Sequence, residues 1–389
     1  MSETPAGSQR ASFLQFGMVA GEASGDLLAG LLLDGMKARW PDLSSVGVGG
    51  PRMIERGFEA WWPSDRLAVH GYAEALKVYR QLVALRNELG DRLIERRPAA
   101  FVGVDAPDFN LGLEARLKRE GIRTIHFVCP SIWAWRGSRV RKLHESADHV
   151  LCLFPFEPAL LAQSGVPASF VGHPLADAIP MEPPRQASRA LLGLSQRDVV
   201  IAVMPGSRRG EIRHIAPSFL RAARMLREQR SDIVCVLPVA PGLRTMVEEA
   251  VSQAGAQDAV RLVDGQSHAV MAASDVVMVA SGTATLEAAL FKRPMVIGYR
   301  LHWLSWQIMR HMRYQPWVGL PNVLSREFVV PELLQDELQP DALVREVLHW
   351  LDDDVATQRT VQRFHELHSS LRRDTARSAT DAIAKVIHA

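Results

Sequence analysis

The sequence predicts an α/β protein made of two doubly wound, Rossmann-like domains. Its 389 residues are enough for two domains, and short apolar segments alternate with amphipathic segments along most of the chain. Pro174, Pro180, Pro183 and Pro184 interrupt this alternation near the middle, and the pattern then starts again. We therefore expect two parallel sheets, covered by helices on both faces, whose loops face a cleft.

Six apolar segments in the first half have the length and composition of buried strands. They are residues 13–20, 45–48, 100–104, 124–128, 149–153 and 169–171. Amphipathic stretches such as 27–39 and 111–119 lie between them and predict the connecting helices. We place the first domain at residues 1–175 and include in it a helical stretch at about 66–97.

The same alternation returns after the proline-rich linker. Strands are expected at residues 199–204, 233–239, 260–262, 276–280 and 295–298. We place the second domain at residues 198–340. The remaining residues, 341–389, are helical in pattern and rich in charge, and we expect them to pack back across the domains.

The composition excludes several classes of protein. The formal net charge is only +2, so no strong overall field would attract nucleic acid. The N-terminal residues are polar and carry little positive charge, so we expect no secretory signal. No apolar stretch approaches the roughly 18 residues that a membrane-spanning helix needs.

The three cysteines, Cys129, Cys152 and Cys235, each lie inside an apolar run. This placement indicates buried thiols in a reducing compartment. Neither a C-x-x-C nor an H-E-x-x-H spacing occurs in the sequence. We therefore expect no metal site and no cofactor.

The first strand runs into a loop of small residues, as in dinucleotide-binding folds, yet this loop carries Glu22 and Asp26. Two carboxylates would repel a phosphate held at the turn. Together with Ser24 they suit the hydroxyls or amides of a sugar, although Ser24 and Asp26 also suit a helix N-terminus. The first domain is therefore predicted to hold a polyhydroxylated acceptor rather than a nucleotide.

The corresponding turn of the second domain, PGSRRGE, has the opposite chemistry. Ser207 offers a hydroxyl and Arg208 a guanidinium, and Gly206 allows close approach of the backbone. Such a turn suits a pyrophosphate or a uridine-type nucleotide. A solvated arginine pair at a loop explains the same residues equally well when the motif is considered alone.

A second loop of this domain, ASGTATLE, also follows a strand and opens a helix. Ser281, Gly282 and Thr283 would present backbone N–H groups to phosphate oxygens, and Glu287 would accept hydrogen bonds from ribose hydroxyls. A capping role for Thr283 and Glu287 is the alternative. Two phosphate-suited loops in one domain favour nucleotide binding more than either loop does separately.

A candidate general base follows the strand at residues 100–104, in the segment VDAPDFN. Asp105 lies nearest to the strand end, where it could deprotonate an alcohol that attacks an activated sugar. Asp108 is better explained as a cap of the following helix.

Eight motifs now occur in the order found in the bacterial lipid-A-disaccharide synthase family, which the chain resembles from about residue 13 to beyond residue 330. The motifs are AGEASGD, VGVDAPDFN, PSIWAWR, GHPLAD, PGSRRGE, SGTATLE, MVIGYR and LPN. The departures are small: Ala23 stands where a hydroxyl residue is also familiar, and Arg209 adds a cation after the Ser-Arg pair.

The resemblance implies a GT-B glycosyltransferase with an inverting mechanism that joins UDP-2,3-diacylglucosamine to 2,3-diacylglucosamine 1-phosphate. The products would be a β-1,6-linked disaccharide 1-phosphate and UDP. The resemblance implies that Asp105 is the base and that Arg208 contacts the UDP phosphates. It places the other residues that hold UDP at Ser207, Ser281, Gly282, Thr283, Glu287 and Asn322.

Lipid substrates imply contact with a membrane, and residues 70–97 and 301–320 combine apolar, aromatic and basic side chains as interfacial segments do. The residues expected to contact the membrane or acyl chains are Val69, Tyr72, Leu76, Tyr79, Leu82, Trp303 and Trp306. A helix packed on both faces explains the first segment, and a subunit interface such as that of a homodimer explains the second. We expect a cytoplasmic protein that is bound peripherally at the inner face of the inner membrane.

Two other functions are compatible with parts of this pattern. A UDP-N-acetylglucosamine epimerase of the same fold would lack acyl-chain surfaces. A non-catalytic nucleotide-sugar-binding protein would keep PGSRRGE but would have no need of Asp105. A dehydrogenase is disfavoured because no G-x-G-x-x-G follows the first strand.

Overall fold

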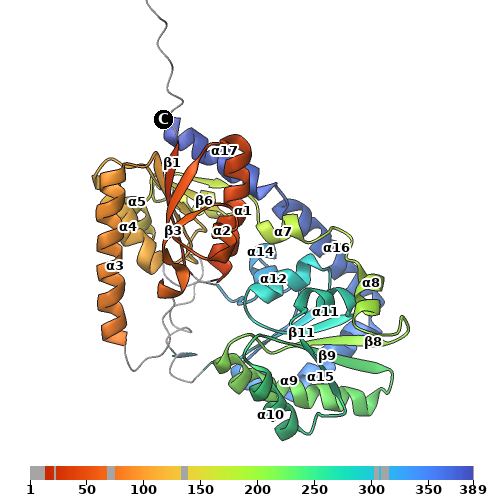
Figure 1. Ribbon diagram of the computed structural model, residues 1–389. Coiled ribbons are helices and arrows are strands. Elements are labelled where there is room, and N and C mark those ends of the chain that lie inside the picture. The colour runs from red at the N-terminus through yellow and green to blue at the C-terminus, as the bar shows by residue number, and fades with distance from the viewer. Residues whose placement is uncertain are drawn as a thin grey trace, which may run out of the picture. The chain divides into compact units, whose positions relative to one another are not determined.

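The computed structural model describes residues 14–21, 23–67, 75–132, 139–301, 306–307 and 315–388. The chain forms two compact units, one made of residues 1–174 and 373–389 and the other of residues 175–372 (Figure 1). The C-terminal helices are divided between them. Helices α15 (Pro340–Asp352) and α16 (Asp354–Leu371) belong to the second unit, whereas α17 (Thr375–His388) packs against α1 (Ala23–Arg39) in the first.

The first unit is built on a seven-stranded sheet in the order β3-β2-β1-β4-β5-β6-β7, in which every neighbouring pair is parallel. Its strands are β1 (Gln15–Ala20), β2 (Ser44–Gly49), β3 (Glu59–Pro63), β4 (Ala100–Val104), β5 (Thr124–Phe127), β6 (His149–Cys152) and β7 (Ala168–Phe170). Its remaining helices are α2 (Pro51–Ile54), η1 (Ser64–Leu67), α3 (Ala75–Arg96), α4 (Pro107–Arg119), α5 (Arg139–Ser146) and α6 (Glu157–Ala162).

Apolar side chains cover both faces of this sheet. On one face Leu32 of α1 and Ile383 of α17 share a buried cluster with Met18 of β1. On the other face Leu89 of α3 and Leu113 of α4 pack with neighbouring strand residues. The strands are buried on both sides, which explains why they are nearly continuous apolar runs in the sequence.

The second unit is built on a six-stranded sheet in the order β10-β9-β8-β11-β12-β13, again entirely parallel. Its strands are β8 (Val199–Met204), β9 (Ile233–Val239), β10 (Val260–Asp264), β11 (Val276–Ala280), β12 (Met295–Tyr299) and β13 (Glu332–Leu334). Helix α7 (Pro174–Ala178) begins at the unit boundary, and the others that precede α15 are α8 (Arg185–Leu191), α9 (Arg209–Gln229), α10 (Arg244–Ala254), α11 (Ser267–Ala273), α12 (Thr283–Leu290), α14 (Leu320–Ser325) and η2 (Gln335–Glu337).

The predicted fold class, two doubly wound units with parallel sheets, is confirmed. Sequence analysis missed two strands, β3 and β13, each at the edge of its sheet. The segment of β3, EAWWP, is only half-buried and ends in proline, and β13 contributes three half-buried residues. Neither has the long apolar run that identified the central strands.

The strand order reverses beside the first strand of each sheet. In the first unit β1 lies between β2 and β4, with Ala20 opposite Val104, and in the second unit β8 lies between β9 and β11, with Met204 opposite Val279. Chains that leave such adjacent strand ends turn to opposite faces of the sheet and leave a crevice between them. The loops after β1, β4, β8 and β11 therefore border the expected binding sites.

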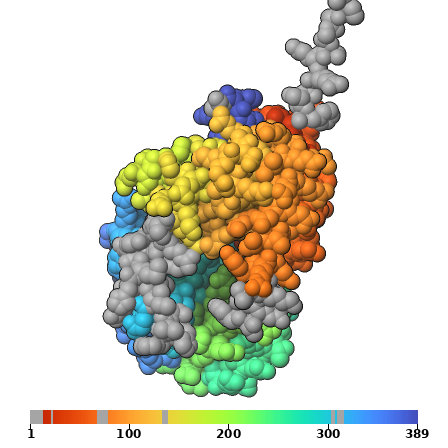
Figure 2. All heavy atoms as spheres, turned by 90° about the vertical axis from the view of Figure 1, so that its left-hand side faces the viewer, coloured from red at the N-terminus to blue at the C-terminus, as the bar shows by residue number. Residues whose placement is uncertain are grey.

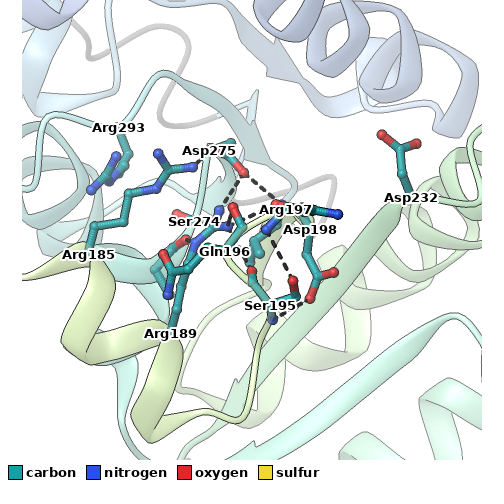
Figure 3. Close-up of polar contacts among 12 residues, drawn as sticks. Arg185, Arg189, Ser195, Gln196, Arg197, Asp198, Asp232, Ser274, Asp275 and Arg293 are labelled. Atoms are coloured by element: carbon teal, nitrogen blue, oxygen red, sulfur yellow. Dashed lines mark hydrogen bonds and ion pairs between the residues drawn. The ribbon is translucent and has the colours of Figure 1, made fainter.

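A buried guanidinium ties α8 to the central strands of the second unit (Figure 3). Arg189 is fully buried, and it donates hydrogen bonds of 3.0 Å to four backbone carbonyls, those of Ser195, Gln196, Asp198 and Ala273. Its Nη2 also donates at 2.9 Å to Asp275, just before β11. Asp275 in turn accepts a hydrogen bond from the backbone N–H of Val200 in β8.

We expect Arg189→Met to lower the free energy of unfolding of the second unit by about 3 kcal/mol or more, because it leaves four backbone carbonyls without their buried donor, while Asp275 keeps its ion pair with Arg185. Urea denaturation followed by tryptophan fluorescence measures the change. Arg197→Met, at an exposed position of the same region, is the matched control. Equal midpoints for the two variants would contradict this role for Arg189.

Candidate functional site

A pocket of about 440 Å³ lies at the strand-order reversal of the second unit. Residues from the loops after β8, β9, β10 and β11 line it. Among them are six residues that the sequence analysis assigned to nucleotide binding: Ser207, Arg208, Ser281, Gly282, Thr283 and Glu287. The fold thus brings the two phosphate-suited loops together, although residues 212–279 separate them in the sequence.

The PGSRRGE turn is closed by Glu211, a residue that sequence analysis did not single out. Its Oε2 accepts hydrogen bonds from the backbone N–H groups of Ser207 at 2.8 Å and Arg208 at 3.1 Å. Gly206 has φ of +120°, and a Cβ at this position would collide with the Glu211 carboxylate. Glu211 is the third residue of α9, where an acidic side chain commonly caps the helix start, and this spacing was the available signal.

Glu211 occupies these two N–H donors, but Ser207 and Arg208 remain exposed at the pocket. The Arg208 side chain is 77% exposed and its Nη1 lies 3.8 Å from Glu211 Oε1, which is a weak contact. The guanidinium therefore borders the pocket with most of its donors open to a ligand.

The loop between β11 and α12 presents the start of a helix to the same pocket. Gly282 has φ of +150°, a conformation that favours glycine, and it directly precedes α12. The Ser281 hydroxyl donates to Val318 O at 3.0 Å, so its oxygen still has acceptor capacity. The N–H groups at this helix start suit an anion.

Glu287 lies one turn into α12, with its side chain largely buried. Its Oε2 is 3.6 Å from Nε2 of His268, a half-exposed residue of α11. The nearby Glu287 carboxylate raises the pKa of His268 above its ordinary value. The carboxylate is thus paired with a histidine at the wall of the pocket, which the sequence did not indicate.

Asn322 lies away from this pocket lining. It is fully buried in α14, and its Oδ1 accepts hydrogen bonds from the backbone N–H groups of Val329 and Val330 at 2.8 and 3.0 Å. Its Nδ2 donates to Val330 O and to Glu332 Oε1. In this arrangement the amide holds β13 against α14, and direct contact with a nucleotide would require these bonds to break.

A second pocket, of about 400 Å³, lies at the strand-order reversal of the first unit. Asp105 borders it at the end of β4, together with Gly21 after β1 and Arg86 of α3. Much of the remaining lining is apolar and consists of Leu67, Tyr79, Leu82, Val83, Pro107 and Phe109. The sequence predicted Asp105 at a strand end that faces a cleft, and in the structure this residue borders a pocket with largely apolar walls.

The acidic first turn has a structural use. Asp26 is buried, and its carboxylate accepts three backbone hydrogen bonds, from the N–H groups of Gly50, Arg52 and Met53 at 2.9, 2.9 and 3.2 Å. It therefore caps α2, which leaves it little capacity for an acceptor sugar. Ser24 is exposed near the start of α1, and Glu22 lies outside the described residues.

The expected membrane contacts on helix α3 are partly core residues and partly exposed. Helix α3 packs Leu85, Leu89 and Leu93 into the core of the first unit, whereas Tyr79 near its N-terminal end is 63% exposed. The helix lies at the surface of this unit, drawn in orange in Figures 1 and 2. The stripe along 82, 85, 89 and 93 is thus mainly a core-packing face.

Several of these expected contacts cannot be placed. Val69, Tyr72 and Trp303 lie outside the described residues, as does the side chain of Leu76, while Trp306 is half-buried and Leu82 borders the second pocket. Within the described part of the chain, no helix is both long and apolar enough to cross a bilayer.

Two of the three cysteines come together with an acid. The ligand atoms of Cys129, Cys152 and Glu157 lie within 4.8 Å of one another, and all three residues are buried. Contact with the Cys129 thiol, burial and the Glu157 carboxylate raise the pKa of Cys152, so the thiol form is favoured at neutral pH. The sequence spacing does not reveal this cluster because Cys129 follows β5 whereas Cys152 ends β6.

Two doubly wound units, with a phosphate-suited pocket in the second, define the GT-B class of nucleotide-sugar proteins. The fold is similar to a solved UDP-GlcNAc 2-epimerase from Neisseria meningitidis bound to UDP-GlcNAc, with a TM-score of 0.64, 11% identity and coverage of 96% of this chain and 100% of that chain. It is also similar to MurG of Acinetobacter baumannii, with a TM-score of 0.59, 12% identity and coverage of 96% and 99%. These likenesses concern the fold alone.

Sequence relatives identify the family. The family model for lipid-A-disaccharide synthetase matches residues 17–387. The lipid-A-disaccharide synthase of Albidiferax ferrireducens is 54% identical over 385 residues, which cover 98% of this chain and 99% of the relative. That of Verminephrobacter eiseniae is 54% identical over 379 residues, covering 96% and 97%. The chain belongs to the lipid-A-disaccharide synthase family of glycosyltransferases, the enzyme family that its motifs predicted.

We expect the His268–Glu287 pair to make stability depend on pH. Because the folded-state pKa of His268 is raised, the pair stabilises the fold fully below the ordinary pKa of 6.5, and this contribution is lost as pH rises through the folded-state pKa. NMR titration of His268 should show a pKa above 6.5 that falls in Glu287→Gln but not in Glu249→Gln, an exposed control. An unchanged titration in Glu287→Gln would contradict the pairing.

Proposed function

We propose that the chain transfers 2,3-diacylglucosamine from UDP to the 6-hydroxyl of 2,3-diacylglucosamine 1-phosphate, with inversion at the anomeric carbon. The products are a β-1,6-linked disaccharide 1-phosphate and UDP. The observation that carries this proposal is the chemical difference between the two pockets. One combines an exposed guanidinium with the N–H groups of a helix start, and the other places a carboxylate beside apolar walls.

The pocket of the second unit is proposed to hold UDP. Arg208 pairs with the diphosphate, and the N–H groups at the start of α12, after Ser281 and Gly282, bind its oxygens. Glu287 accepts hydrogen bonds from ribose hydroxyls. These groups stabilise the negative charge that gathers on departing UDP, so the proposal requires no divalent metal.

The pocket of the first unit is proposed to hold the acceptor. Leu82, Val83 and Phe109 offer apolar contacts for acyl chains, and Arg86 offers a cation for the 1-phosphate. Asp105 removes the proton from the 6-hydroxyl as this oxygen attacks the anomeric carbon opposite UDP. The bond to UDP breaks while the new glycosidic bond forms, and the sugar ring passes through an oxocarbenium-like state.

Acylated substrates reside in a membrane, so we propose that the enzyme works at the inner face of the cytoplasmic membrane. The exposed Tyr79 of α3 lies beside the apolar pocket, which supports an approach of the lipid at this end of the helix.

Asp105→Asn should lower kcat by about 10²-fold or more, because an amide cannot accept the proton of the attacking hydroxyl. Turnover is measured in mixed detergent micelles with both lipid substrates and EDTA. Asp91→Asn is the matched control, since its carboxylate is 72% exposed, pairs with Arg116 and is absent from the pocket lining of the described residues. Similar rates for wild type and Asp105→Asn would remove Asp105 from the role of base.

Arg208→Gln should weaken binding of UDP by about ten-fold or more, because it removes the charge-assisted contact with the diphosphate. Isothermal titration calorimetry with UDP measures this directly. Arg209→Gln is the control, because Arg209 is exposed, adjacent in sequence and absent from the pocket lining of the described residues. Equal losses of UDP affinity in both variants would indicate a general electrostatic attraction of UDP rather than a specific contact with Arg208.

A further inference from the structure

The candidate base lies in a strained turn. Asp105 and Ala106 have φ of +52° and +43°, so two consecutive residues other than glycine adopt the left-handed conformation. L residues rarely do so, because the Cβ approaches the neighbouring carbonyl oxygen. Such a conformation persists only when surrounding contacts hold it, and it is commonly found at functional sites.

The contact that holds this turn comes from Asn110, on the first turns of α4. The side chain is fully buried, and its Nδ2 donates to the carbonyl of Asp105 at 2.8 Å and to that of Val104 at 3.4 Å. The Asp105 N–H donates to Phe127 O at 2.9 Å, so this residue is fixed on both of its backbone sides. One amide thus joins the end of β4 to the turn that carries the carboxylate.

A second layer of buried polar groups lies next to Asn110. Glu114 is one helical turn further along α4, and its Oε1 is 2.7 Å from Nδ1 of His126 on β5. Both side chains are fully buried. A Cβ on Gly103 would lie 3.0 Å from Asn110 Cβ and would collide with Glu114 Oε1, so the absent side chain of Gly103 makes room for both.

This cluster is poorly suited to a purely stabilising role. Asn110 Oδ1, Glu114 Oε2 and His126 Nε2 are buried and have no hydrogen-bond partner within the described parts of the chain. Buried polar groups of this kind lower stability relative to apolar side chains of similar shape. What the cluster does achieve is a fixed geometry for the turn that follows β4.

We propose that Asn110, which lies beside the buried Glu114–His126 pair, is a positioning residue for the transfer reaction. By bonding two successive carbonyls, Asn110 keeps Asp105 and Ala106 left-handed and so directs the Asp105 carboxylate to the acceptor pocket. The inference rests on the proposed function of Asp105 as base.

The first test is Asn110→Ala in the full-length enzyme. We expect kcat to fall by about 10- to 100-fold, the loss that a small misplacement of a reacting group causes. The KM for the UDP-sugar should change by less than about two-fold, because that site belongs to the second unit. Asn87→Ala, the same change at an exposed position of α3, is the control and should keep the wild-type kcat.

A second substitution, Ala106→Gly, distinguishes an effect of Asn110→Ala on positioning from an effect on stability. Glycine adopts the left-handed conformation readily, so Ala106→Gly should restore kcat of Asn110→Ala by about five-fold or more. Restoration of activity without a matching rise in the thermal midpoint supports positioning. If Asn110→Ala does not fold, Asn110→Ser serves in its place, because a short hydroxyl cannot reach both carbonyls.

A double-mutant cycle with Asp105→Asn tests whether Asn110 acts through Asp105. We expect the double variant to have the same kcat as Asp105→Asn alone. Asn110→Ala lowers kcat only by misplacing the base, so it has no further effect once the base has been removed. Additive losses, or a wild-type kcat for a folded Asn110→Ala, would overturn the inference. Full activity of Asp105→Asn would instead refute the base itself, so failure of the proposed function is recognised separately.

Discussion

The parallel direction of all strands within each sheet is the constraint on which the functional geometry depends. Parallel strands end at one common edge, and the order reverses beside β1 in the first sheet and beside β8 in the second. Asp105 and Gly21 therefore meet at one reversal, and Ser207 and Ser281 meet at the other. Two pockets of different chemistry follow from one topological rule that is applied twice.

Carboxylates occupy backbone N–H groups in both units. Asp26 binds three of them at the start of α2, and Glu211 binds two in the turn before α9. Each acid thus fills a position where a helix start would otherwise attract an anion. In the second unit this leaves the Arg208 side chain and the loop before α12 as the proposed partners of a diphosphate.

The two buried polar clusters, around Arg189 and around Asn110, differ in how completely their polar atoms are hydrogen-bonded. Arg189 donates hydrogen bonds to four backbone carbonyls and to the Asp275 carboxylate, so its loss would leave these acceptors without their buried donor. Asn110, Glu114 and His126 leave three buried atoms without partners in the described residues, and their cluster adjoins a strained turn. A fully hydrogen-bonded network suits a residue that connects structural elements. A network with buried atoms that lack partners lowers stability, and we relate it to the need to position a reacting group.

The sequence by itself determined the fold class, the central strands and the family, because long apolar runs and contiguous motifs are local signals. It also indicated Arg208, Ser281 and Asp105, which border the two pockets, since each lies in a loop that follows a strand. Only the tertiary structure decided which polar residues are free to meet a ligand. Asp26 and Asn322 are engaged by backbone groups, and Glu211 and His268 approach their partners through folding. Residue type gives the chemistry of a side chain, but its partners depend on how the chain folds. They lie within one turn for Glu211 and in a separate segment for Asp26 and His268.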